Sequence, residues 1–167
     1  MPAFGGWFSV DDVDLLHVRP DMSTALVAQG GDIRPFGQGM DGDAFVGIDG
    51  ELLLVDVITD TYQTIHNMIE MNAVTWDAAD DELIFGTFDF AANSLDLFTA
   101  GTDGSTTFIA GLSDVDAPHQ VELMAKGGRV FFMYDTVLGG RRLGSVKKDG
   151  TGVPALHGVL ARSSLSC

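Results

Sequence analysis

Among the side chains of this sequence, three Asp-x-Asp pairs have the spacing that most nearly fits a chemical function, which is metal binding. They are Asp12/Asp14, Asp41/Asp43 and Asp114/Asp116. Such pairs could supply the hard oxygen ligands that calcium prefers. None of them continues into a calcium-binding loop that ends in a glutamate, so solvated turn carboxylates are the simpler interpretation. The sequence therefore predicts no cofactor and leaves calcium as the one metal to consider, with Asp41, Asp43, Asp114 and Asp116 as its candidate ligands.

The stretch Gly37-Gln38-Gly39-Met40-Asp41-Gly42 matches the dinucleotide-binding pattern G-x-G-x-x-G letter for letter. That chemistry needs a strand before the glycines and a helix after them, so that the pyrophosphate meets a helix N-terminus. The residues that follow, 44–48, have the apolar character of a strand instead. We therefore expect a flexible acidic loop here and no dinucleotide.

Catalytic side chains show no recognisable spacing. The four histidines, none of which forms a His-x-x-x-His pair, are His17, His66, His119 and His157. There is no G-x-S-x-G nucleophile motif, and Cys167 is both the only cysteine and the last residue, which excludes an internal disulfide. The sequence predicts that the protein is not an enzyme, although a site assembled from distant segments stays open.

The charge is strongly acidic, with 24 acidic against 9 basic side chains and a net charge of -15. Such a surface repels phosphate backbones and anionic headgroups, so we expect no nucleic-acid partner. No apolar run is long enough for membrane insertion, and no signal peptide is visible. The excess of Asp over Glu points to turns, and a saline habitat is an alternative cause of the acidity. Arg141, Arg142, Lys147 and Lys148 form the one basic cluster, which we interpret as a solvated hairpin or a docking point for a second chain.

A repeat runs through most of the chain. Two short segments recur at nearly the same spacing. The apolar run Leu83-Ile84-Phe85 has a counterpart 47 residues later in Val130-Phe131-Phe132, and the turn Asp103-Gly104-Ser105 has a counterpart 46 residues later in Asp149-Gly150-Thr151. Aligned in this way, Asp60, Asp103 and Asp149 share one turn position, and Phe45, Phe85 and Phe132 share one strand position. Units of about 40 to 47 residues with several short strands are the size of one β-propeller blade.

We expect a single β-repeat domain over residues 13–160. Its units span about 13–65, 73–112 and 121–158, preceded by a loose leader at 1–12 and followed by a disordered tail at 161–167. In the first unit, a hairpin within 15–28 should lead into a long loop at 29–42 that contains Pro35.

The second unit resembles a blade of the TolB-like β-propeller family. Its matching residues, in chain order, are Trp76, Asp80-Asp81, Leu83-Ile84-Phe85, Leu95-Asp96-Leu97-Phe98 and Thr102-Asp103-Gly104-Ser105. The resemblance covers mainly residues 73–156. It implies an all-β fold of antiparallel four-stranded blades and a non-enzymatic binding or scaffolding module for protein or small-ligand recognition. It also implies a place in the cell envelope or periplasm.

Three units are fewer than the roughly four to eight blades of a closed propeller. The fold class we predict is therefore a partial or incomplete β-propeller, with a β-sandwich or barrel as the alternative. Open sheet edges invite a protein partner or self-association. The alternative function is a non-catalytic propeller segment of a larger hydrolase or peptidase.

Overall fold

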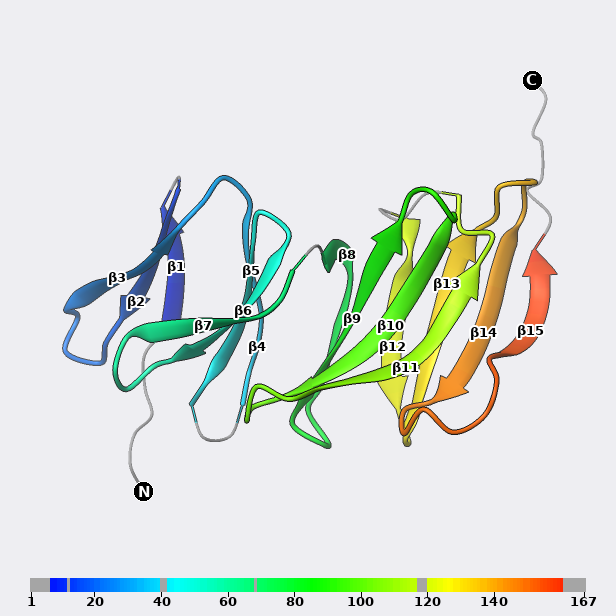
Figure 1. Cartoon of the computed structure of the whole chain (residues 1–167). Coiled ribbons are helices and arrows are strands. Elements are labelled where there is room, and N and C mark those ends of the chain that lie inside the picture. The colour runs from blue at the N-terminus through cyan, green and yellow to red at the C-terminus, as the bar shows by residue number, and fades with distance from the viewer. Residues whose placement is uncertain (1–6, 12, 40–41, 68, 117–119, 161–167) are drawn as a thin grey trace.

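The computed structural model describes residues 7–11, 13–39, 42–67, 69–116 and 120–160. These residues form fifteen strands in four antiparallel sheets, which follow one another in chain order (Figure 1). No helix of the described part is long and apolar enough to cross a membrane.

Each sheet is a simple up-and-down meander. The first contains β1 (Trp7–Asp11), β2 (Asp14–Val18) and β3 (Thr24–Gln29). The second contains β4 (Ile33–Gln38), β5 (Ala44–Ile48), β6 (Glu51–Asp56) and β7 (Thr61–His66). The third contains β8 (Ile69–Asp77), β9 (Glu82–Asp89), β10 (Ser94–Gly101) and β11 (Thr106–Ser113). The fourth contains β12 (Glu122–Lys126), β13 (Arg129–Asp135), β14 (Arg141–Lys147) and β15 (Ala155–Leu160).

The predicted unit at 13–65 is wrong, because these residues belong to two sheets. Trp7–Asp11 pairs with β2 as a strand, although residues 1–12 were expected to be a loose leader. The expected loop at 29–42 contains β4. Pro35 argues against a strand at this place in the sequence. The proline is tolerated because β4 is an edge strand with a register shift between Pro35 and Gly37. The tail predicted at 161–167 lies outside the described residues.

A β-bulge at the same place in every sheet establishes which strands are equivalent. The register shifts fall at Leu15/Leu16, Leu52/Leu53, Leu97/Phe98 and Leu143/Gly144. Each one lies between the last two strands of its sheet, so β2 corresponds to β6, β10 and β14. Among the described residues, the first sheet therefore has no counterpart of β4, β8 and β12, the strands that begin the other three sheets.

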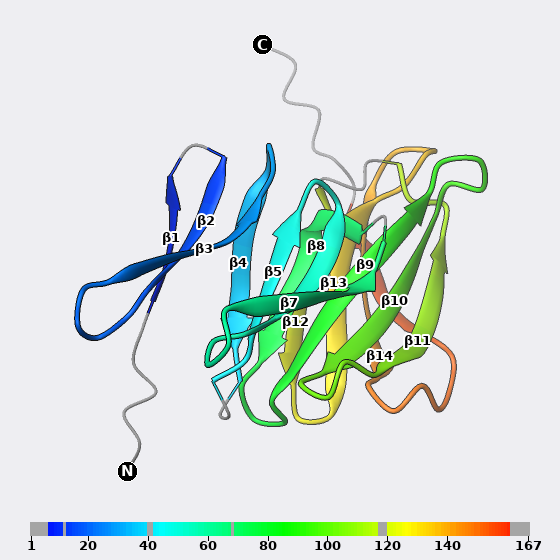
Figure 2. The ribbon, with the colours of Figure 1, turned by 60° about the vertical axis from the view of Figure 1, so that its left-hand side comes forward.

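The core consists of three apolar clusters, one between each pair of successive sheets. Leu15, Leu52 and Leu97, the first bulge residue of their sheets, are all fully buried against the following sheet. The strands β4, β8 and β12 lie next to one another along one side of the array (Figure 2). Each sheet depends on its neighbours to cover its apolar faces, as expected for a repeat protein.

The proposed equivalence of Phe45 with Phe85 and Phe132 is wrong by one residue. Ala44, Leu83 and Val130 pair with Val55, Ala100 and Val146, each three residues beyond the first bulge leucine. Phe45 therefore corresponds to Ile84, and Val46 corresponds to Phe85. Because side chains alternate between the two faces of a strand, Phe45 and Phe85 face each other from neighbouring sheets within one cluster.

Candidate functional site

The outer surface of the fourth sheet carries an apolar patch that no part of the described chain covers. We call this surface the open face and define it by Met124, Phe131, Met133 and Leu143, with Glu122 at its border. These side chains line a hollow of about 210 Å³. Met124 is 53% exposed and Leu143 is 39% exposed. The register explains the patch, because Met124 pairs with Phe131 and Leu143 pairs with Met133 on one face of the sheet.

The repeat shows what usually happens to these positions. Leu143 is the first bulge residue of its sheet, as Leu15, Leu52 and Leu97 are of theirs, and those three are fully buried. Phe131 corresponds in the same way to Phe45 and Ile84, which are also fully buried, whereas Phe131 is only partly covered. In each of the other three sheets, the surface that corresponds to the open face is covered by the next sheet.

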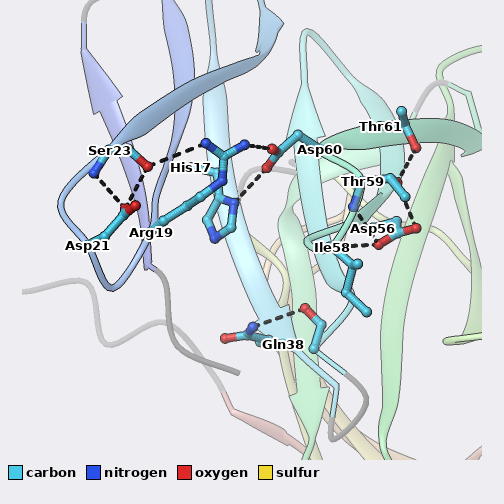
Figure 3. A network of polar contacts seen from close by, with 11 residues as sticks. His17, Arg19, Asp21, Ser23, Gln38, Asp56, Ile58, Thr59, Asp60 and Thr61 are labelled. Atoms are coloured by element: carbon cyan, nitrogen blue, oxygen red, sulfur yellow. Dashed lines mark hydrogen bonds and ion pairs between the residues drawn. The ribbon is translucent and has the colours of Figure 1, made fainter. Parts of the chain in front are cut away.

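The polar cluster around Asp60 joins the first sheet to the second (Figure 3). His17 Nδ1 lies 2.6 Å from Asp60 Oδ1, and Arg19 donates a hydrogen bond to the other carboxylate oxygen. Burial raises the pKa of Asp60, but the hydrogen bonds from His17 and Arg19 outweigh it and lower the pKa below its usual value. A histidine beside a carboxylate could suggest catalysis, yet here both groups connect two sheets.

A second polar cluster joins the fourth sheet to the third. Lys148 Nζ lies 2.9 Å from Asp77 Oδ2 and 3.0 Å from Glu82 Oε2, and it also contacts Asp80. Burial lowers the pKa of Lys148, but the hydrogen bonds to these three carboxylates raise it well above its usual value. The hydrogen bond from Lys148 lowers the pKa of Asp77. The turn after β14 is thereby attached to the turn between β8 and β9.

The predicted solvated hairpin is wrong for most of the basic cluster. Arg141 Nε lies 2.9 Å from Asp135 Oδ1, and Arg142 lies 3.1 Å from Asp114 Oδ2. With Lys148 bound to the third sheet, Lys147 is the exposed member of the cluster. Sequence order alone does not show this, because the partners of Lys148 lie 68 and 71 residues away.

The structure does not gather the candidate calcium ligands into one site. Asp114 is paired with Arg142, Asp116 is exposed, and Asp43 lines a hollow between the second and third sheets. Asp41 lies outside the described residues. Within the described ranges, no group of three or more His, Cys, Asp or Glu side chains could hold a metal ion. Solvated turn carboxylates stay the preferred interpretation of these aspartates, and calcium stays the alternative.

The glycine-rich stretch has a structural role at its first residue. Gly37 lies in β4, and a Cβ atom there would come within 2.6 Å of the Trp76 ring. Gly37 thus allows the second sheet to approach the third. The prediction of a flexible loop over this stretch is wrong for Gly37 and Gln38, because both are strand residues. Gly42 follows in the turn before β5, with a positive φ.

The other histidines also have structural neighbours. The His66 ring lies 5.0 Å from the Phe85 ring and 5.1 Å from the Phe98 ring. His157 Nε2 lies 2.8 Å from Ser145 Oγ. His119 lies outside the described residues, as does Cys167.

Turn aspartates account for part of the acidic composition. Asp21, Asp103 and Asp149 each accept a hydrogen bond from the backbone N–H two residues ahead, and the pKa of each is lowered, mainly by the hydroxyl of Ser23, Ser105 or Thr151. Asp60 does not share this position, contrary to the sequence alignment. Its positive φ, like those of Gly104 and Gly150, places it one residue further along the turn.

Comparisons with known proteins support a β-propeller architecture. No family model and no curated protein sequence matches the chain. A solved chain in a nidogen/laminin complex is similar at 11% identity, with a TM-score of 0.56 over 93% of this chain and 61% of that chain. An oligogalacturonate lyase in complex with manganese and one from Vibrio parahaemolyticus are similar at 14% and 12% identity. Both have a TM-score of 0.51 over 83% of this chain and 44% of theirs.

The chain thus has an all-β fold of the incomplete β-propeller class, as predicted. It spans between 44% and 61% of the length of these structural neighbours. At such identities the likeness concerns the fold alone.

Proposed function

We propose that this chain is a non-enzymatic β-propeller module that recognises another protein through the open face of its fourth sheet. The observation that carries the proposal is the exposure of Leu143, at a position that is fully buried in every other sheet of the repeat. An apolar surface of this kind on a folded protein marks a place where something binds.

The shape of the open face favours a protein over a small ligand. Its hollow of about 210 Å³ is smaller than the pockets of roughly 300–1,000 Å³ that hold small molecules. Methionine and aromatic side chains are enriched at protein interfaces, and both types are present here. A small ligand, which we also predicted, would have to bind elsewhere on the array.

The charged clusters support a non-catalytic role. His17, Asp60 and Arg19 hold the first two sheets together, and Lys148 holds the last two. The hydrogen bonds of both clusters connect one sheet to the next.

A second candidate function is a non-catalytic propeller segment of a larger enzyme. The two oligogalacturonate lyases favour it, because this chain spans only 44% of their length. In that case the open face would be covered by further sheets of the same polypeptide.

Site-specific cross-linking tests the proposed function. A photoreactive side chain at Met124 should label a bound protein, and the same group at Leu138, which is 91% exposed on a loop after β13, should not. Labelling that is equal at both positions would contradict recognition through the open face. Turnover of oligogalacturonate in the presence of manganese would contradict the non-enzymatic role.

A further inference from the structure

We propose that the protein bound at the open face is a second copy of this chain, whose first sheet packs on the fourth sheet of its partner. Two chains arranged head to tail would then close one ring of eight sheets. This inference rests on the proposed function, since it names the protein that the open face recognises.

The open face is built to receive a sheet. Its residues Leu143 and Phe131 correspond to Leu97 and Ile84 of the third sheet, which the fourth sheet buries completely. The fourth sheet also has the same bulge as the three sheets before it and the same strand order as the second and third sheets. A surface with this repeat-encoded geometry fits the face of another sheet better than it fits a helix or an extended peptide.

The first sheet offers the matching surface. Leu16 is the second bulge residue of its sheet and corresponds to Leu53 and Phe98, which pack toward the preceding sheet. Leu16 pairs with Leu26 on one side and with Ser9 on the other, so these side chains form a row across the sheet. Leu26 is 53% exposed. No preceding sheet covers this row within the described chain.

The charges at the rim of the two surfaces are complementary. Between the first two sheets, Arg19 binds Asp60, which lies in the last turn of the following sheet. Lys147 stands four residues after the bulge leucine Leu143, as Arg19 stands four residues after Leu15, and it is exposed. The corresponding turn of an incoming first sheet carries Asp21, one residue before the position that Asp60 holds in its own turn, so Asp21 could pair with Lys147 at the same rim of the interface.

The shape of the array also favours two copies. The first and fourth sheets lie at opposite ends of the array, so the described residues of one chain leave both surfaces uncovered (Figures 1 and 2). Propellers close with about four to eight blades, and two copies supply eight sheets. A head-to-tail contact that occurs twice in a closed pair uses both surfaces of both chains.

The oligomeric state of the full chain tests the inference by light scattering after size exclusion, from low micromolar concentration upward. We expect the mass of two chains for the wild type and the mass of one chain for Leu143→Arg and for Leu26→Arg. The control Leu138→Arg changes the same residue type on an exposed loop and should remain a dimer. Circular dichroism and thermal unfolding of each variant should show that it is folded.

Mixing the two variants distinguishes a head-to-tail contact from a symmetric one. The Leu26→Arg chain keeps a normal open face, and the Leu143→Arg chain keeps a normal first sheet, so one intact interface should form and give a dimer of the two variants. The charge pair adds an independent check, because Asp21→Lys and Lys147→Asp should each weaken the dimer and their combination in one chain should restore it.

Three results would overturn the inference. They are a wild-type chain that is monomeric at all concentrations, a dimer that withstands both arginine substitutions, and a dimer that Leu143→Arg disrupts but Leu26→Arg does not. A monomer that is still cross-linked to another protein from Met124 would leave the proposed function standing. A dimer that forms without protein labelling at Met124 would contradict both.

Discussion

Lys148 Nζ lies 2.9 Å from Asp77 Oδ2, across the boundary between the third and fourth sheets. Both side chains are largely buried, and 71 residues of sequence separate them. The contact shows how this chain uses charged groups, which here attach one sheet of the repeat to the next.

Replacing Lys148 should therefore destabilise the protein. Lys148→Met leaves Asp77 without its partner in a largely buried place, and we expect a loss of about 1–3 kcal/mol in the free energy of unfolding. Urea denaturation measures the change. Lys126→Met, at an exposed strand end, should cost less than about 0.5 kcal/mol. Equal losses in both variants would show that the cluster does not hold the sheets together.

The pKa of Asp60 predicts a loss of stability in acid. Its folded-state pKa lies below the ordinary value of 3.8, so the unfolded state binds the proton more readily. The stabilisation is present above about pH 4 and is lost as the pH falls through the folded-state pKa. Asp60→Asn should flatten this acid limb in denaturation experiments between acidic and neutral pH. Asp11→Asn, at an exposed position, should keep the wild-type slope.

Gly37 should not tolerate a side chain. The Cβ of Gly37→Ala would come within 2.6 Å of the Trp76 ring, and we expect a cost of about 1–3 kcal/mol because β4 or the ring must move. Gly158→Ala, in β15, meets nothing within 4 Å and should change the stability by less than about 0.5 kcal/mol. Thermal unfolding followed by tryptophan fluorescence compares the two. A stable Gly37→Ala variant with unchanged fluorescence would contradict the close packing of β4 on Trp76.

Calcium should have little effect on the fold. Asp114 already pairs with Arg142 at 3.1 Å, and the guanidinium opposes a cation at that carboxylate. We expect the same melting temperature with added calcium and with chelator. A melting temperature that rises with calcium and falls with chelator would instead support the site proposed from the Asp-x-Asp pairs.

The repeat and the strand-rich fold could be predicted from the sequence, because they depend on local patterns. Short apolar runs such as Leu83-Ile84-Phe85 and turn residues such as Asp103-Gly104 act over a few positions. These patterns predicted the third and fourth sheets as the units 73–112 and 121–158, but they joined most of the first two sheets into one unit. They missed β4, because Pro35 and the nearby glycines resemble a loop until the neighbouring strand is in place.

Only the tertiary structure decided which residues of the repeat are exposed at the surface and which are buried. Leu97 and Leu143 hold the same place in the repeat, yet one is fully buried and the other lies on the open face. Their difference comes from whether another sheet follows, which no local pattern encodes. Likewise, the partners of Asp60 and Lys148 come from distant parts of the chain, because packing of whole sheets brings those turns together.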